Sequence, residues 1–148
     1  MKIITALEGG LAGAAVLTSL HEIIKRKTPE APRMDLLGMN ALSKILSRAF
    51  HTTADPRKLF LWTMAGDLVA NTLYYSLSGI GSRKTIPYKA AVLGILAGAG
   101  ALVLPKPLGL NEQYSARTNK TKFLTLALYV AGGIVAGAAI KILESKKR

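Results

Sequence analysis

The stretch LFLWTMAGDLVANTLYYSLSGI, residues Leu59 to Ile80, decides the fold that this sequence predicts. It is long and apolar enough to cross a bilayer as a helix, yet Asp67 lies near its centre. Polar residues recur along it at steps of three and four, which places them on one stripe of a helix. They are Thr63, Asp67, Asn71, Tyr74 and Ser78. A spanning helix with a polar stripe needs neighbours that shield the stripe from lipid, so we expect the other segments to pack around it.

Composition also favours a membrane protein. The chain has 148 residues, half of them hydrophobic, and a mean hydropathy of +0.30 although it carries 20 Lys and Arg and 8 acidic residues. These charges gather between long apolar blocks, whereas a soluble core alternates polar and apolar residues along each element. The net charge of +12 is then explained by anionic lipid head groups beside the apolar blocks, not by nucleic acid. The absence of cysteine excludes disulfides and thiol chemistry.

Four apolar segments are predicted to be transmembrane helices in one membrane domain, residues 1–148. Their approximate ranges are 3–24, 56–80, 87–104 and 123–143. We expect the first to be a helix and not a signal peptide, because Glu8 would interrupt the apolar region of a leader. The third has only about fifteen purely apolar residues, so a re-entrant segment stays open as an alternative.

Between the first two spans, residues 34–50 have apolar side chains at steps of three and four and polar ones on the other face. This pattern predicts a short amphipathic helix, either lying along the membrane surface or capping the bundle. Asp55 and Pro56 then form a helix start, with Asp55 as the N-cap. The predicted fold class is therefore all-α: a polytopic membrane protein with four transmembrane helices and one interfacial helix.

Three of the spans share a phrase of small residues: GGLAGAA from Gly9, GILAGAG from Gly94 and GIVAGAA from Gly133. Each contains a G-x-x-x-G pair, which in lipid lets two helix backbones approach closely. The pairs are Gly9 with Gly13, Gly94 with Gly98, and Gly133 with Gly137. We expect these glycines at helix–helix contacts, within one chain or between copies.

Asp67 is the strongest candidate for chemistry, because an ionised and unpaired carboxylate at mid-depth costs several kcal/mol. It is interpreted as a proton or cation site, with Asn71, Tyr74 and Glu8 as further candidates along a polar route. The alternative is an interhelical hydrogen-bond clamp, in which case replacing Asp67 by leucine should be neutral or stabilising. For Glu8 the alternative is a side chain that extends to the interface.

A second group of polar residues is predicted to meet where the first span ends. His21 and Glu22 close that span, and Arg33, Asp35 and Arg117 lie in the two long connections. Together they are candidates for an interfacial pocket for a lipid head group or small anion; ordinary interfacial charge is the alternative. No metal site or cofactor is predicted, because the two histidines have no zinc-like spacing and no phosphate-binding glycine loop follows a strand.

The phrases LHEIIKRKTPEAPRMDLLGMN (20–40) and GDLVANTLYYSLSGIGS (66–82) resemble those of an uncharacterised group of small four-span proteins of bacterial inner membranes. The resemblance covers the first half of the chain. It implies a bacterial inner-membrane setting and transfers no activity.

Three functions fit these observations. The first is an oligomeric channel or transporter with a proton- or cation-interacting carboxylate in the second span. The second is a non-catalytic accessory or assembly subunit of a larger membrane complex, and the third, a minor one, is an enzyme acting on lipid beside His21. The two long connections carry twelve Lys and Arg against eight elsewhere. The positive-inside rule then predicts cytoplasmic long connections and both termini outside.

Overall fold

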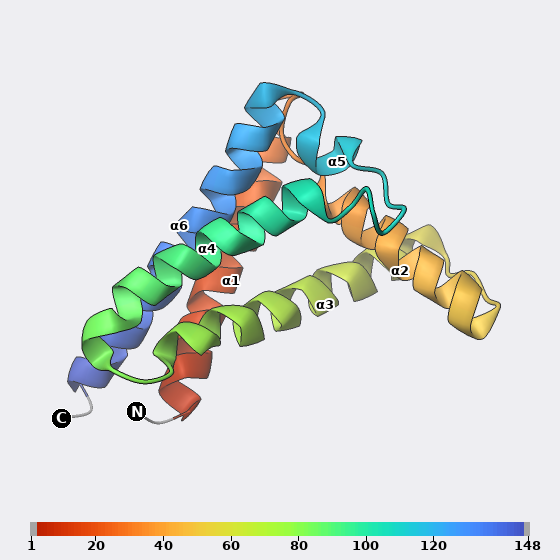
Figure 1. The fold of residues 1–148 in the computed structure, drawn as a ribbon. Helices are drawn as coiled ribbons and strands as arrows, with labels where there is room; N and C mark the ends of the chain where they lie inside the picture. The colour runs from red at the N-terminus through yellow and green to blue at the C-terminus, as the bar shows by residue number, and fades with distance from the viewer. Residues whose placement is uncertain (1–2, 147–148) are drawn as a thin grey trace.

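Helices and short connections make up residues 3–146, the part of the chain that the computed structural model describes. Within this range there is no strand, so the all-α prediction is confirmed (Figure 1). The helices are α1 (Ile3–Lys25), α2 (Met34–Phe50), α3 (Pro56–Ser76), α4 (Ile86–Val103), α5 (Gln113–Ala116) and α6 (Asn119–Lys146); two 3₁₀ turns, η1 (Leu77–Gly79) and η2 (Arg83–Thr85), join α3 to α4. Lys2, Lys147 and Arg148, which enter the charge count above, lie outside the described residues.

Three helices are long and apolar enough to cross a membrane: α1, α6, and the segment Arg83–Val103 that contains α4. The helix α3 is not among them, although it is 21 residues long. The polar stripe around Asp67 is the physical reason, because it lowers the hydropathy of a segment whose length suffices. The chain is thus an all-helical protein with three candidate membrane spans.

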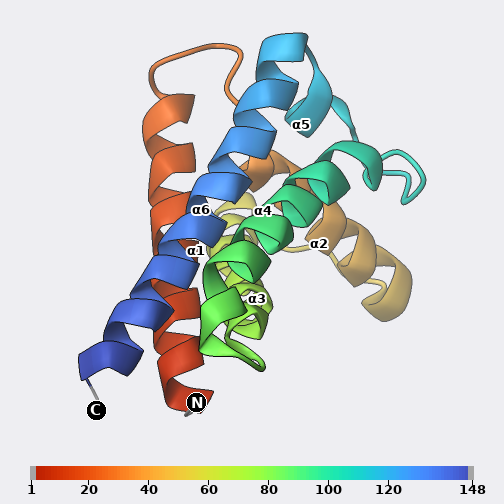
Figure 2. The same cartoon turned by 60° about the vertical axis from the view of Figure 1, so that its left-hand side comes forward.

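The three candidate spans lie side by side, with α6 between α1 and α4 (Figures 1 and 2). Glycines stand at both contacts. A Cβ added to Gly13 of α1 would lie 2.5 Å from the Gly132 carbonyl oxygen, and one added to Gly94 of α4 would lie 2.8 Å from the Tyr129 oxygen. Cβ atoms do not approach other atoms this closely, so only glycine permits these helix separations.

The predicted glycine positions all face a neighbouring helix. Gly9 and Gly13 lie against α6, Gly94 and Gly98 against α6, and Gly133 and Gly137 against α4. Two further glycines act in the same way outside the G-x-x-x-G pairs. Gly10 lies against α3, where its Cβ would be 3.0 Å from the Ser76 nitrogen, and Gly132 lies beside the Tyr75 hydroxyl.

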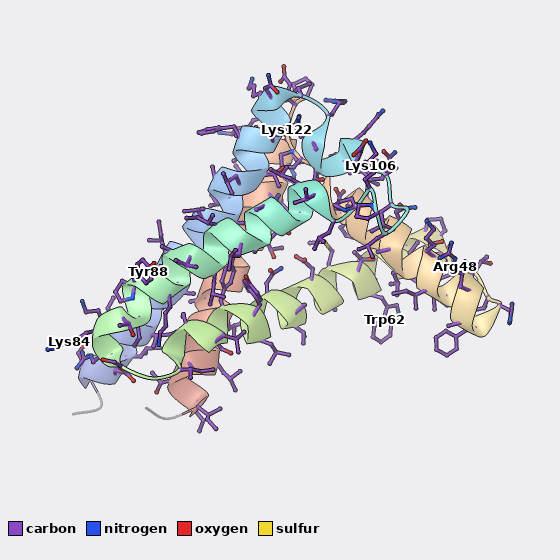
Figure 3. All side chains as sticks on the ribbon, in the orientation of Figure 1. Arg48, Trp62, Lys84, Tyr88, Lys106 and Lys122 are labelled. Atoms are coloured by element: carbon purple, nitrogen blue, oxygen red, sulfur yellow. The ribbon has the colours of Figure 1, made fainter. Side chains whose placement is uncertain are left out.

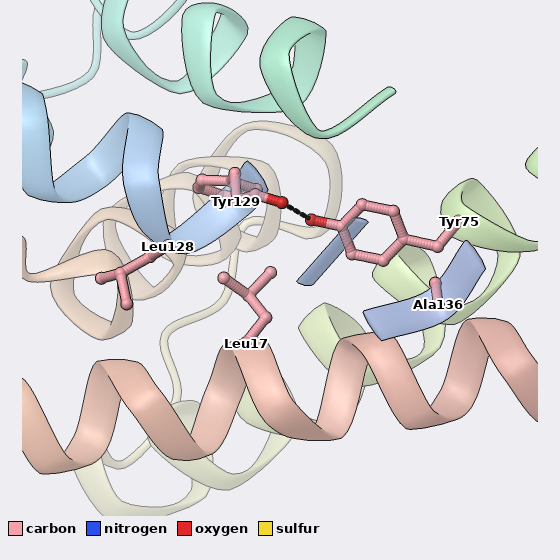
Figure 4. Packing of buried hydrophobic residues seen from close by; sticks show 5 residues of the cluster. All are labelled: Leu17, Tyr75, Leu128, Tyr129 and Ala136. Atoms are coloured by element: carbon pink, nitrogen blue, oxygen red, sulfur yellow. Dashed lines mark hydrogen bonds between the residues drawn. The ribbon is translucent and has the colours of Figure 1, made fainter. Parts of the chain in front are cut away.

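The C-terminal half of α3 packs on this layer. Tyr75 is fully buried in a cluster with Leu17 of α1 and with Leu128, Tyr129 and Ala136 of α6 (Figure 4). Its hydroxyl donates a 2.8 Å hydrogen bond to the Tyr129 carbonyl oxygen. This bond joins α3 to α6 in the centre of the molecule.

The N-terminal half of α3 leaves the layer and runs beside α2 (Figure 1). Asp55 caps α3 as predicted: its carboxylate accepts hydrogen bonds from the Arg57 and Lys58 nitrogens at 3.0 and 3.2 Å. The two helices are in close contact at Gly38, whose added Cβ would lie 2.5 Å from the Thr63 methyl group. The helix α2 buries only Leu37, so it covers the molecule's edge without being part of its core.

Candidate functional site

Two cavities lie on either side of Asp67. The first cavity, about 450 Å³, is a pocket that opens to the surface between α1, α2 and α3, and the second cavity, about 600 Å³, is a more open groove between α3, α4 and the segment 104–110. Asp67, Ala70 and Met34 line both of them. The second cavity exists because α3 and α4 part as they leave the turn that joins them (Figure 1). Asp67 therefore lines two adjoining hollows, both of which open to the surface of the molecule.

The hydrogen bonds of Asp67 stay within its own helix. The Asn71 side-chain amide donates to the Asp67 carboxylate at 2.9 Å and to the Asp67 carbonyl oxygen at 3.0 Å. Within residues 3–146 no cationic side chain forms an ion pair with Asp67. The predicted pairing with Asn71 is present, and it joins no two helices.

Tyrosines make the interhelical hydrogen bonds instead. Tyr74, predicted to lie on the polar route, donates a 3.0 Å hydrogen bond from its hydroxyl to the Leu93 carbonyl oxygen of α4, and its side chain lines the second cavity. Tyr75 makes the corresponding bond to α6. The sequence pattern missed Tyr75, because it lies beside the polar stripe and looks like an apolar position.

The first cavity has several buried polar atoms with no hydrogen-bond partner among the described residues: Thr18 Oγ1, His21 Nε2 and Thr63 Oγ1. The side chain of Thr63 is 8% exposed. The other nitrogen of His21, Nδ1, lies 3.1 Å from the Leu17 carbonyl oxygen. A carbonyl oxygen only accepts, so in this contact Nδ1 carries the proton. In the neutral imidazole Nε2 is then an acceptor.

An ionic cluster closes the first cavity where α1 meets α2. Lys25 donates to Glu22 at 2.6 Å and to Asp35 at 3.1 Å, and Arg33 donates two further bonds to Asp35. Burial alone raises the pKa of Asp35, but the hydrogen bonds from Arg33 and Lys25 outweigh it, and the pKa lies below its usual range. The hydrogen bonding of Arg33 to Asp35 raises the pKa of the Arg33 guanidinium. Because two cations meet two carboxylates, the cluster is close to neutral.

The predicted interfacial group is therefore brought together only in part. His21, Glu22 and Asp35 line the first cavity, and Arg33 bonds to Asp35. Arg117 lies elsewhere and donates to the Pro29 carbonyl oxygen, which ties the two long connections together. Arg117 thus contributes to the packing of the two connections. Its contact with Pro29 cannot be predicted from spacing along the sequence.

Glu8 also lies apart from Asp67. It is exposed near the start of α1, and neither cavity is lined by it. Thr18 and His21, about three turns further along α1, take the position beside α3 that the sequence analysis gave to Glu8. Thr18 was visible in the sequence as a hydroxyl on a neighbouring span; which turn of α1 meets Asp67 depends on the crossing of α1 and α3.

Among residues 3–146 no group of three or more His, Asp or Glu side chains is placed to hold a metal ion. Comparisons with protein families, curated proteins and solved structures find no match for this chain. The argument for function therefore rests on the site.

Proposed function

We propose that this chain is a small integral membrane channel or transporter in which Asp67 binds a proton or small cation. The observation that carries the proposal is the position of Asp67 in the wall shared by two cavities. A carboxylate between two such spaces can exchange a proton or cation with each, which is what a transport site requires. The two cavities give a proton or cation the space to approach Asp67, which a closely packed apolar bundle would not.

The path of the chain supports four membrane crossings. The helices α1 and α4 run in the same direction, so the residues between them must return across the molecule, and α3 provides most of that return (Figures 1 and 2). At about 1.5 Å per residue, the 21 residues of α3 span about 31 Å. Basic side chains at both ends fit the two membrane surfaces, with Lys84 where α4 begins and Lys122 near the opposite end (Figure 3).

In this proposal α2 is the interfacial helix. Its exposed apolar side chains, Ile45 and Phe50, would contact acyl chains, while Lys44 and Arg48 lie near anionic head groups. The setting that the sequence resemblance implies is a bacterial inner membrane, and we propose that copies associate there as an oligomer. Alkaline phosphatase fused after Leu46 would be inactive if the long connections are cytoplasmic, and activity there would overturn this orientation.

The hydrogen bonding of Asp67 favours a transport site over a clamp. A clamp must join two helices, but the bonds from Asn71 lie within α3. Tyr74 and Tyr75 already bond α3 to α4 and α6. Asp67 is therefore not needed to join α3 to its neighbours. A structural clamp at Asp67 would have favoured the accessory-subunit alternative, and the hydrogen bonds do not support such a clamp.

The experiment is a flux measurement with purified protein in liposomes that contain a pH-sensitive dye, driven by a potassium diffusion potential. The wild-type protein should carry protons or the cation supplied, and Asp67→Asn should reduce the rate to that of empty liposomes. Glu112→Gln removes one negative charge from an exposed loop and should leave the rate unchanged. An Asp67→Asn variant as active as wild type would contradict the proposal.

A further inference from the structure

The walls of the first cavity differ in chemistry from one helix to the next. Beyond Asp35, which is paired with Lys25 and Arg33, the α2 wall is apolar, and α3 adds the aromatic ring of Trp62. The α1 wall is polar and faces α3 with Thr18 and His21. A proton or metal ion makes no favourable contact with apolar side chains. A cavity with both kinds of wall suits a molecule that has an apolar body and a polar end.

The polar groups without partners mainly accept hydrogen bonds. Nε2 of His21 presents a lone pair, because Nδ1 uses its proton toward Leu17. The Asp67 carboxylate has acceptor sites beyond the one that Asn71 occupies. The hydroxyls of Thr18 and Thr63 are buried without a partner among the described residues and can accept as well. Such a set selects a ligand that is rich in donors.

Charge points the same way. The carboxylates of Glu22 and Asp35 are paired with Lys25 and Arg33, whereas Asp67 has no ion-pair partner within residues 3–146. A cationic ligand would therefore find one uncompensated carboxylate, and an anionic ligand would find no free cation in the lining. The charges of the lining therefore favour a cation over the small anion that the sequence analysis considered for the interfacial group.

We propose that the first cavity binds a primary ammonium ion that carries an apolar group. Its N–H groups donate to Asp67 and to the acceptors of His21, Thr18 or Thr63, and its apolar body lies against α2 and Trp62. This inference rests on the proposed function and names the class of cation that the Asp67 site takes.

Binding is measured with the protein in nanodiscs, using the fluorescence of Trp62, which lines the cavity and is the single tryptophan of the chain. The probes are 2-phenylethylammonium, its N-trimethyl analogue, which keeps the charge but lacks N–H donors, and 3-phenylpropionate. We expect the primary ammonium ion to bind at least about tenfold more tightly than the analogue, and the anion not to bind. Equal affinity for all three probes would overturn the proposal.

Variants locate the site. Asp67→Asn keeps an acceptor for Asn71 but loses the charge, and should abolish binding; Thr63→Val should weaken it several-fold and leave the selectivity for N–H donors in place. Glu112→Gln is the matched control and should bind as wild type. If protons still flow in an Asp67-dependent way but no variant changes ammonium binding, this inference fails and the proposed function stands. If ammonium binds through Asp67 but nothing is carried, the transport proposal fails alone.

Discussion

The layer of α1, α6 and α4 and the pair formed by α2 and the first half of α3 are built in opposite ways. In the layer, backbones approach so closely that an added Cβ at Gly13 or Gly94 would collide with the next helix. In the α2–α3 pair, an added Cβ at Gly38 would also collide, but a pocket of about 450 Å³ lies between these helices and α1, and a groove of about 600 Å³ lies between the second half of α3 and α4. The layer is closely packed, whereas α3 has an open hollow on two of its sides.

We expect the layer to supply most of the stability and the α2–α3 pair to contain the functional site. Close packing along glycine faces supplies van der Waals contact where lipid gives little hydrophobic drive between helices. Residues that line a hollow make fewer such contacts, so we expect the α2–α3 pair, which contains the polar site, to contribute less to stability. Substitutions should therefore affect the two regions differently.

The largest effect is expected in the layer. Gly13→Leu should unfold the protein or destabilise it by about 3 kcal/mol or more, because a Cβ there would lie 2.5 Å from the Gly132 oxygen and 2.6 Å from the Ala136 Cβ. Gly66→Leu on α3 is the matched control, since its Cβ would meet nothing within 4 Å. Thermal melting in detergent measures both. Equal melting temperatures for the two variants would contradict the claim that the layer is the more closely packed region.

A smaller loss is expected at the junction of the two regions. Tyr75→Phe removes a buried interhelical hydrogen bond and should cost about 1 kcal/mol. Tyr74→Phe removes the bond to α4 at the edge of the second cavity, where the ring is only half-buried, and should cost less. Denaturant unfolding of the two variants checks the order. A larger loss for Tyr74→Phe would mean that the cavity wall is the more rigid region.

The smallest effect is expected from acid on the α2 contact. The pKa of Asp35 is lowered in the folded protein, so the stabilisation is complete above its ordinary value of 3.8 and disappears as the pH falls through the lowered pKa. The change should be about 1 kcal/mol or less, because Arg33 is largely open to solvent. Trp62 fluorescence should report it while circular dichroism stays helical. In Asp35→Asn, Trp62 fluorescence should lose that pH dependence; a transition that persists in the variant would come from another group.

The helices could be predicted from the sequence, because apolar blocks and helix starts such as Asp55-Pro56 are local signals. The proximity of Asp67 and Asn71 could also be predicted, because the two residues are one helical turn apart. The sequence did not show which residues of α1 line the same cavity as Asp67, since whether Glu8 or His21 lies beside α3 depends on where the two helices cross. Tyr75 was missed because its importance comes from the carbonyl oxygen of Tyr129, 54 residues away.

A transport site at Asp67 requires that water reaches this side chain, and thiol labelling tests this directly. The chain has no cysteine, so a single Asp67→Cys variant gives an unambiguous signal. In liposomes a water-soluble, membrane-impermeant thiol reagent should label Asp67→Cys and leave Val69→Cys unlabelled, because Val69 is 58% exposed on the outer surface of α3 and would face lipid. An unlabelled Asp67→Cys, or equal labelling at both positions, would contradict a hydrated site on a membrane-crossing helix.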